Sequence, residues 1–115
     1  MPILEIQTNV PAANVPDNFL KESTTLLAGL VGKPESYVLV CIEPGLRLMF
    51  GGTTEPAAIV NLTNIGQHDP ATTKHRSKVI SNHIQKTLGV PADRMYIIFH
   101  DKQRFEVGYN GATFH

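Results

Sequence analysis

Met1 and Pro2, at the start of the chain, are the first candidates for chemistry. Methionine aminopeptidase removes a methionine that precedes a small residue, and Pro2 would then begin the chain with a free secondary amine. An α-amino group has a pKa of about 8 in model peptides, and burial or a nearby cation lowers that pKa by disfavouring the charged form. Such an amine can act as a general base near neutral pH. With Met1 retained, the Pro2 nitrogen is an amide without basicity, and many chains that begin with Met-Pro make no chemical use of the proline.

Lys33 is the second candidate, because it follows the expected end of a helix and precedes an apolar strand. In that position its ammonium group would bind an anionic group of a substrate and lower the pKa of a nearby amine. The alternative is a solvated lysine that complements the carbonyl end of the helix dipole.

The rest of the composition argues against most other kinds of site. Ten basic and ten acidic residues balance one another, so no nucleic-acid partner is expected. Cys41 is the only cysteine and the five histidines lack the spacing of metal ligands, so we expect no disulfide, no metal and no cofactor. No apolar run has the length of a membrane span and no leader opens the chain. We therefore expect a cytoplasmic protein without membrane insertion, which would be secreted without a signal peptide if it acts outside the cell.

The elements that would position Pro2 and Lys33 form two similar halves. In the first half, the apolar pattern predicts a strand over residues 3–8. Asn14, followed by a proline and an acidic residue, predicts the start of a helix that Gly32 ends. Further strands are predicted over residues 37–42 and 46–50.

The second half repeats this order. A strand is predicted over residues 57–65, and Asp69 with the proline after it predicts the start of a second helix, which Gly89 ends. A second apolar strand is predicted over residues 95–99. Parts of the two halves also match in letters, since Thr8-Asn9-Val10 recurs as Thr63-Asn64-Ile65.

We interpret the chain as a single domain, residues 1–115, with repeats at about 1–57 and 58–115. The fold class is α+β, an α/β sandwich in which two β-α-β repeats form a four-stranded mixed sheet with two helices on one face. The strands over 37–42 and 95–99 are apolar on both faces, which a sheet with one face in water would not be. The sequence therefore predicts an oligomer that covers the open face, with a closed barrel as the competing explanation.

Short motifs over the whole length resemble the macrophage migration inhibitory factor and D-dopachrome tautomerase family. No single motif decides the resemblance, but Pro2, Lys33 and Ile65 at these separations are specific to it. The motifs are Pro2, Thr8-Asn9, Gly32-Lys33-Pro34 with Tyr37, Phe50-Gly51-Gly52, Glu55-Pro56, Asn64-Ile65-Gly66, Asp93-Arg94 with Tyr96, and Asn110-Gly111-Ala112-Thr113-Phe114.

The resemblance implies a homotrimer whose sheets line a central barrel, with the helices outside. It also implies a cofactor-free keto–enol tautomerase that acts on phenylpyruvate-like or dopachrome-like substrates in a pocket at each subunit boundary. Pro2 would be the general base, and Lys33 and the backbone N–H of Ile65 would hold the carboxylate or carbonyl of the substrate. Tyr96 would come from a neighbouring chain. The apolar walls would be formed by Tyr37, Val107, Tyr109 and Phe114.

Three positions depart from the family pattern. Ile98 stands where the vertebrate inhibitory factor has an asparagine, so a polar contact to the distal end of the substrate is expected to be absent. Losing one hydrogen bond commonly costs about 1 kcal/mol, which would shift substrate preference more than abolish catalysis. Tyr109 replaces a tryptophan. Ala57 and Val60 replace a CxxC motif, so no thiol–disulfide activity is expected.

Two other functions remain open. Members of the resembled family also act as cytokines on a cell-surface receptor, so a secreted receptor ligand with a vestigial pocket is the alternative function. The β-α-β pattern alone also fits a ferredoxin-like binding module. An RNA-binding form of that module would need exposed aromatic side chains on its strands and a basic face, and the sequence indicates neither.

Overall fold

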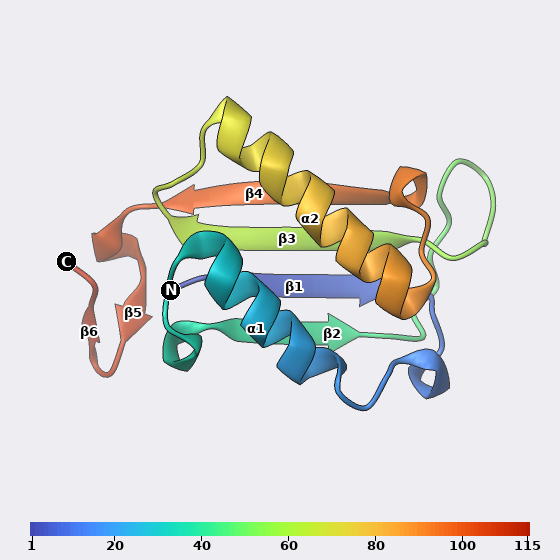
Figure 1. Cartoon of the computed structure of the whole chain (residues 1–115), viewed down its shortest axis with the longest axis horizontal. Helices are drawn as coiled ribbons and strands as arrows, with labels where there is room; N and C mark the ends of the chain where they lie inside the picture. Colours follow the sequence, from blue (N-terminus) through green and yellow to red (C-terminus); the bar gives the residue numbers. More distant parts are fainter.

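The strand β1 (Ile3–Thr8) lies inside a four-stranded sheet in the computed structural model, which describes all residues 1–115 (Figure 1). It pairs in parallel with one neighbour and antiparallel with the other. The strand order is β2-β1-β3-β4, and the other three strands are β2 (Leu39–Glu43), β3 (Ala58–Ile65) and β4 (Met95–Lys102). Because β3 pairs in parallel with β4, two parallel pairs are joined through one antiparallel contact, which makes the sheet mixed.

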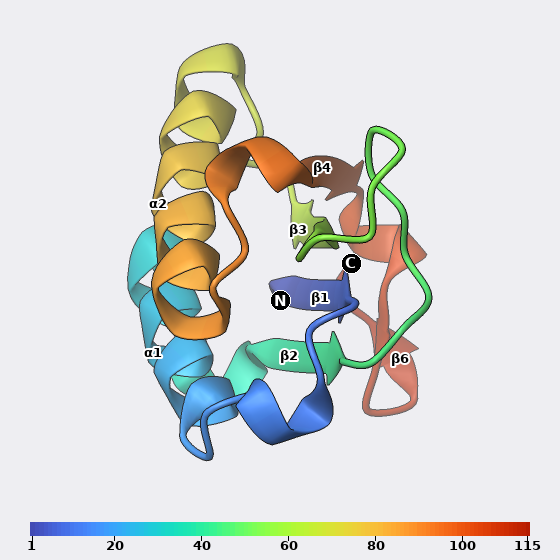
Figure 2. The ribbon, with the colours of Figure 1, turned by 90° about the vertical axis from the view of Figure 1, so that its right-hand side faces the viewer.

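Each parallel pair is connected by one helix, and both helices cover the same face of the sheet. The helix α1 (Phe19–Val31) connects β1 to β2, and α2 (Pro70–Leu88) connects β3 to β4. Turned by 90°, the molecule shows the helices as one layer and the strands as a second (Figure 2). The predicted fold class is therefore confirmed: two β-α-β repeats form an α+β sandwich with two helices on one face.

The helix ends follow the expected capping chemistry except at the start of α1. Asp69 accepts a hydrogen bond from the backbone nitrogen of Thr72 at 2.9 Å, and Gly32 and Gly89 end the two helices in the left-handed conformation. The predicted start at Asn14 is wrong, because Ala12–Asn14 is a single 3₁₀ turn and α1 begins at Phe19. Val15 precedes a proline and is held extended, which prevents the turn from continuing into a helix.

The strand boundaries also differ from the prediction. Instead of starting at residue 37, β2 follows a 3₁₀ turn, Glu35–Tyr37, and begins at Leu39, while β4 continues beyond residue 99. Residues 46–50 form no strand. At its start, the backbone nitrogen of Leu46 donates to the carbonyl oxygen of Thr8, the last residue of β1, at 3.0 Å. The only bridge of the segment joins Phe50 to Thr53, so it pairs with no strand of the sheet.

The core lies between the sheet and the two helices. Alternate residues of the central strands point into this layer, so that Leu4 of β1 and Leu62 of β3 are fully buried. They meet the buried stripes of the helices. The stripe of α1 comprises Phe19, Ser23, Leu27 and Val31, and that of α2 comprises Arg76, Ile80, Ile84 and Leu88.

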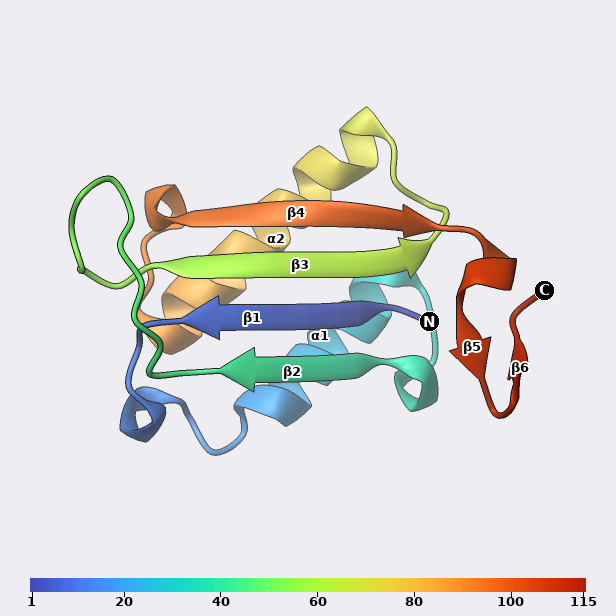
Figure 3. The ribbon, with the colours of Figure 1, turned by 180° about the vertical axis from the view of Figure 1, so that it is seen from behind.

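The opposite face of the sheet is not covered by any helix of the chain. From behind, the four strands face the viewer and both helices lie beyond them (Figure 3). Leu39, Tyr96 and Ile98 are 57%, 68% and 47% exposed on this side. Exposed apolar side chains on both edge strands, β2 and β4, are typical of a surface that binds another protein chain.

Replacing Leu27 by alanine tests the core. This side chain is 1% exposed and packs between α1 and the sheet, so its loss should lower the free energy of unfolding by about 2–5 kcal/mol. Leu20 is a matched control, because it lies on the same helix but is 49% exposed. Leu20→Ala should change that free energy by about 0.5 kcal/mol or less in urea unfolding. Equal losses in the two variants would contradict the assignment of the buried stripe.

Candidate active site

A cavity of about 510 Å³ opens at the end of the sheet where β1 begins and β3 ends. Both the N-terminus and the C-terminal hairpin lie at this end (Figures 1 and 3). The hairpin comprises β5 (Gly108–Tyr109) and β6 (Ala112–Thr113) and follows a 3₁₀ turn, Arg104–Glu106. The cavity is lined by Met1, Lys33, Pro34, Tyr37, Asn64, Ile65, Arg104 and Phe114.

The antiparallel pairing of β1 and β3 brings the predicted residues together. Ile3 stands opposite Thr63, so the N-terminus lies beside the end of β3, where Ile65 is the last strand residue. Lys33 reaches the same place because Gly32 ends α1 and the backbone nitrogen of Lys33 donates to Ala28. Residues far apart in the sequence thus line a single cavity.

The electrostatics at this place favour a neutral amine. Burial lowers the pKa of the terminal amino group below its ordinary value of 8.0, and the positive charge of Lys33 lowers that pKa further. Met1 precedes Pro2, so this amino group belongs to Met1 and the Pro2 nitrogen is an amide. Pro2 itself is fully buried, and its carbonyl oxygen accepts a hydrogen bond from the backbone nitrogen of Leu39 at 3.0 Å. An amine at Pro2 would therefore be held rigidly at the start of β1.

Aromatic side chains lie together beside the cavity. The ring of Tyr37 lies 5.5 Å from that of Tyr109 and 6.1 Å from that of Phe114, and the last two rings stack at 5.4 Å. The carbonyl of Val107 accepts a hydrogen bond from the backbone nitrogen of Phe114 at 3.2 Å. Val107 and Tyr109 line an adjoining apolar cavity of about 340 Å³, which shares Met1, Tyr37 and Phe114 with the first.

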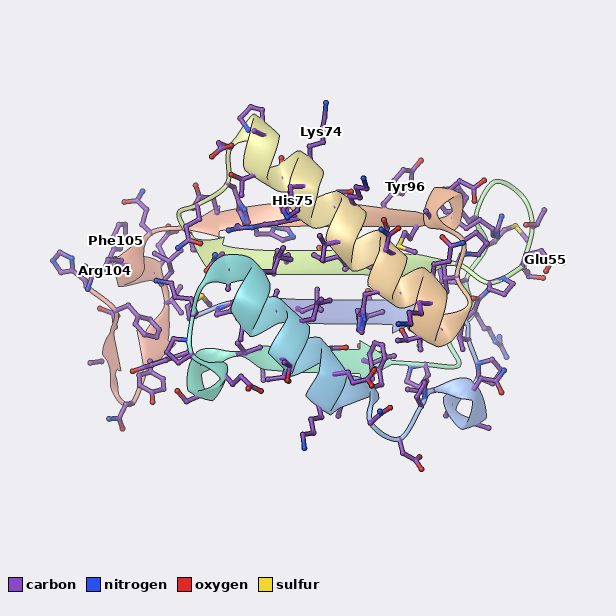
Figure 4. The ribbon with its side chains drawn as sticks, viewed as in Figure 1. Glu55, Lys74, His75, Tyr96, Arg104 and Phe105 are labelled. Carbon is purple, nitrogen blue, oxygen red and sulfur yellow. The ribbon has the colours of Figure 1, made fainter.

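Two predicted site residues lie elsewhere within the chain. Tyr96 is near the start of β4, at the other end of the molecule from Arg104 (Figure 4), and its ring packs on Phe50 at 5.1 Å. Ile98 lies opposite Asn61, in the middle of the edge strand β4, and is exposed on the open face. Neither can reach the cavity of its own chain, so a role for either one requires a neighbouring chain.

Comparison of the chain with known proteins identifies its family. Residues 1–115 match the model of macrophage migration inhibitory factor (MIF). The chain belongs to the macrophage migration inhibitory factor family. Similar relatives include the factor homologue of Trichuris trichiura, 44% identical over 99% of this chain and 100% of the relative, and the factor of Mus musculus, 39% identical over 99% of both.

Solved structures of the family have the same fold. The factor from Trichinella spiralis superposes with a TM-score of 0.94 at 39% identity and covers 97% of this chain and 99% of its own. The homologue from Prochlorococcus marinus gives 0.92 at 40% identity, covering 98% and 99%. Membership in the MIF family supports a function of the tautomerase and cytokine type.

The sequence did not single out two residues that line this cavity. Arg104 donates through Nε to the carbonyl oxygen of Phe114 at 2.7 Å, so it adds a second cation beside Lys33. Asn64 is fully buried, and its Oδ1 is the one buried side-chain polar atom without a hydrogen-bond partner. Arg104 carries no motif signal. Asn64 stands in the repeated Thr-Asn letters and in the motif Asn64-Ile65-Gly66, but neither gave it a role in the site.

Other kinds of site find no support in the structure. Ser23 and His83 form a serine–histidine hydrogen bond of 2.8 Å between the helices, but Ser23 is fully buried, and burial lowers the pKa of His83. No cluster of three or more potential metal-ligating side chains is present. Neither helix combines the length and the apolar composition needed to cross a bilayer.

Replacing Lys33 by alanine tests the electrostatics of the cavity. The pKa of the terminal amino group should rise but stay below 8.0, because the charge is removed while burial, the larger cause, remains. Since only the neutral amine reacts with acylating reagents, its reactivity should require a higher pH in the variant. Lys21→Ala, an exposed change on α1, is the control and should leave that pH dependence in place. An unchanged profile in Lys33→Ala would make Lys33 a helix-end lysine only.

Proposed function

We propose that the protein is a cofactor-free keto–enol tautomerase that uses the amine of Pro2 as general base once Met1 has been removed. The observation that carries this proposal is the cavity itself, which holds the amino end of the chain beside Lys33 and an aromatic wall. Burial and Lys33 lower the pKa of the Met1 amino group there, and we expect the same two causes to act on an amine at Pro2. The substrates are phenylpyruvate-like or dopachrome-like. Their flat rings fit the apolar wall, and their carboxylates fit a cavity lined by two cations.

The proposed reaction moves one proton between carbon and oxygen. In the keto-to-enol direction, the neutral Pro2 amine takes a proton from the carbon beside the carbonyl, and the electron pair of that C–H bond forms the C=C bond. The carbonyl oxygen then receives a proton from the aminium group, so the amine is regenerated. Lys33 and the backbone N–H of Ile65 hold the carboxylate or carbonyl, while Tyr37, Val107, Tyr109 and Phe114 exclude water and keep the amine neutral.

The proposed assembly is a homotrimer with its sheets inside and its helices outside. The uncovered sheet face, with exposed Leu39 and Ile98, supports an assembly in which neighbouring chains cover it. In such an assembly Tyr96 of one chain would complete the cavity of the next, and Ile98 would give the distal end of the substrate an apolar contact.

A second candidate function is a cytokine-like ligand of a cell-surface receptor. Family membership favours it, since the relatives bear the name of a macrophage migration inhibitory factor. We propose a cytoplasmic protein that is secreted without a signal peptide. In the alternative form of this proposal the tautomerase cavity is vestigial and only the receptor-binding surface is used.

The test of catalysis is the conversion of phenylpyruvate from enol to keto, followed by ultraviolet absorbance, on protein whose intact mass shows Met1 removed. Pro2→Gly replaces the rigid secondary amine by a primary amine on a flexible residue and should lower kcat/KM. A chain in which one residue still precedes Pro2 has an amide instead of the base and should lose about 100-fold or more, the usual contribution of a general base. Leu20→Ala, which changes the outer face of α1, is the control. No turnover by the correctly processed wild-type protein would overturn the enzymatic proposal and leave the receptor ligand as the better function.

The assembly has its own test, by size-exclusion chromatography with light scattering. The wild-type protein should have three times the mass of one chain. Ile98→Glu should shift it toward the monomer, because burying an unpaired carboxylate in an interface is costly. Leu20→Glu places the same charge on the outer helix layer and should leave the trimer intact. A monomeric wild-type protein would contradict the trimer.

A further inference from the structure

The unpartnered Oδ1 of Asn64 is the feature that the proposed function leaves unexplained. Asn64 is 0% exposed and lines the cavity, yet no donor reaches this oxygen. Leaving a buried acceptor without a donor costs about 1–3 kcal/mol, so native structures contain few of them. A donor is therefore expected at this place in some state of the protein.

The direction in which Oδ1 points is fixed by its neighbours. Nη2 of Arg76 donates to Oε1 of Gln67 at 3.1 Å, and arginine can only donate, so the facing atom of Gln67 is its oxygen. The atom of Asn64 that faces the same oxygen, at 3.3 Å, is then its donor, Nδ2. An amide flip would place two oxygens against each other, so Oδ1 remains on the other side.

The repeat identifies the missing donor. Thr8 pairs with Ala58 across the antiparallel contact, and continuing that register by one residue places Asn9 opposite Ala57. There, Oδ1 of Asn9 accepts a hydrogen bond from the backbone nitrogen of Ala57 at 2.8 Å. The side-chain nitrogen of Asn9 is also bonded, to the carbonyls of Thr54 and Glu55.

The same register relates Asn64 to Pro2 at the other end of the contact. Ile3 pairs with Thr63, so the next position along each strand places Pro2 opposite Asn64. At this end of the contact, the nitrogen of Pro2 stands where the backbone N–H of Ala57 stands at the other end. The Pro2 nitrogen carries no hydrogen while Met1 is attached. Removing Met1 gives that nitrogen one hydrogen when neutral and two when protonated.

We propose that Asn64 is the positioning residue for the Pro2 amine, accepting a hydrogen bond from it through Oδ1 once Met1 is removed. The inference rests on the proposed function for its catalytic meaning, but the hydrogen bond itself does not. It directs one N–H toward the protein interior, which leaves the lone pair of the neutral amine for the cavity. It also binds the charged aminium more strongly than the neutral amine, so it opposes the effect of burial and of Lys33 on the pKa of Pro2.

The first test measures stability and needs no substrate. Asn64→Leu replaces the amide by an apolar side chain of similar size, and Asn64→Ala is the second variant. Each is compared in the chain that begins with Pro2 and in a chain in which one residue still precedes Pro2. The loss of the bond to Gln67 is common to both chains, so the difference isolates the bond to the amine. We expect the unfolding equilibrium constant to change about tenfold more in the chain that begins with Pro2. Equal changes in the two chains would overturn the proposal.

The second test measures the pKa of the Pro2 amine, by NMR titration of the chain without Met1. Asn64→Leu should lower this pKa by about 1, because an acceptor that favours the aminium is lost. The other titratable groups that line the cavity, Lys33, Tyr37 and Arg104, are retained in the variant. A pKa that does not fall would overturn the proposal.

In the tautomerase assay, the same variant should lower kcat more than it raises KM, because orientation of the base is lost while the substrate contacts remain. A rise in KM as large as the fall in kcat would indicate a structural role for Asn64 and contradict positioning. Absence of turnover in the wild-type protein would remove the enzymatic proposal, whereas the stability and pKa measurements would still decide whether Asn64 binds the amine.

Discussion

The antiparallel contact between β1 and β3 is the constraint on which the rest of the molecule depends. It is the only contact that joins the two β-α-β units within the sheet, and its register decides what meets at each end. At one end it sets the N-terminus beside Ile65. At the other it is locked by Thr8, whose hydroxyl donates to the carbonyl of Ala57 at 2.7 Å. A shift by one residue would move the apolar side chains of one of the two central strands to the wrong face.

The uneven cover of the sheet explains why the cavity of the proposed reaction lies at one end of it. Two helices cover one face and leave the other uncovered within the chain, so each end of the sheet lies between the packed core and an exposed face. The cavity forms at such an end, where an amino group is partly withdrawn from water but still reachable. Lys33 and Arg104 then face a space without any acidic side chain, although the chain as a whole has no net charge.

The fold could be predicted from the sequence largely because its signals are local. Asp69 with Pro70, and the glycines at positions 32 and 89, mark helix ends through their own backbone preferences. The prediction failed at Asn14, where a nearby proline prevents the turn from becoming a helix. Residues 46–50 have the composition of a strand but no neighbouring strand in the chain. Lys33 could be singled out by its place after a helix end, and Ile65 through a family pattern. Arg104 and the free oxygen of Asn64 depend on contacts across the fold that no spacing reveals.

The two repeats also limit how many sites the molecule can have. The internal repeat makes Ala57 the counterpart of Pro2 and Val10 the counterpart of Ile65. The glycine that ends each helix is followed by Lys33 in one repeat and by Val90 in the other. At the second corner all three counterparts are buried, and their side chains are apolar. Duplicating a unit copies its strands and helices, but a polypeptide has a single amino end. Chemistry that needs a free amine therefore has a stoichiometry of one per subunit, and the second corner serves as part of the core.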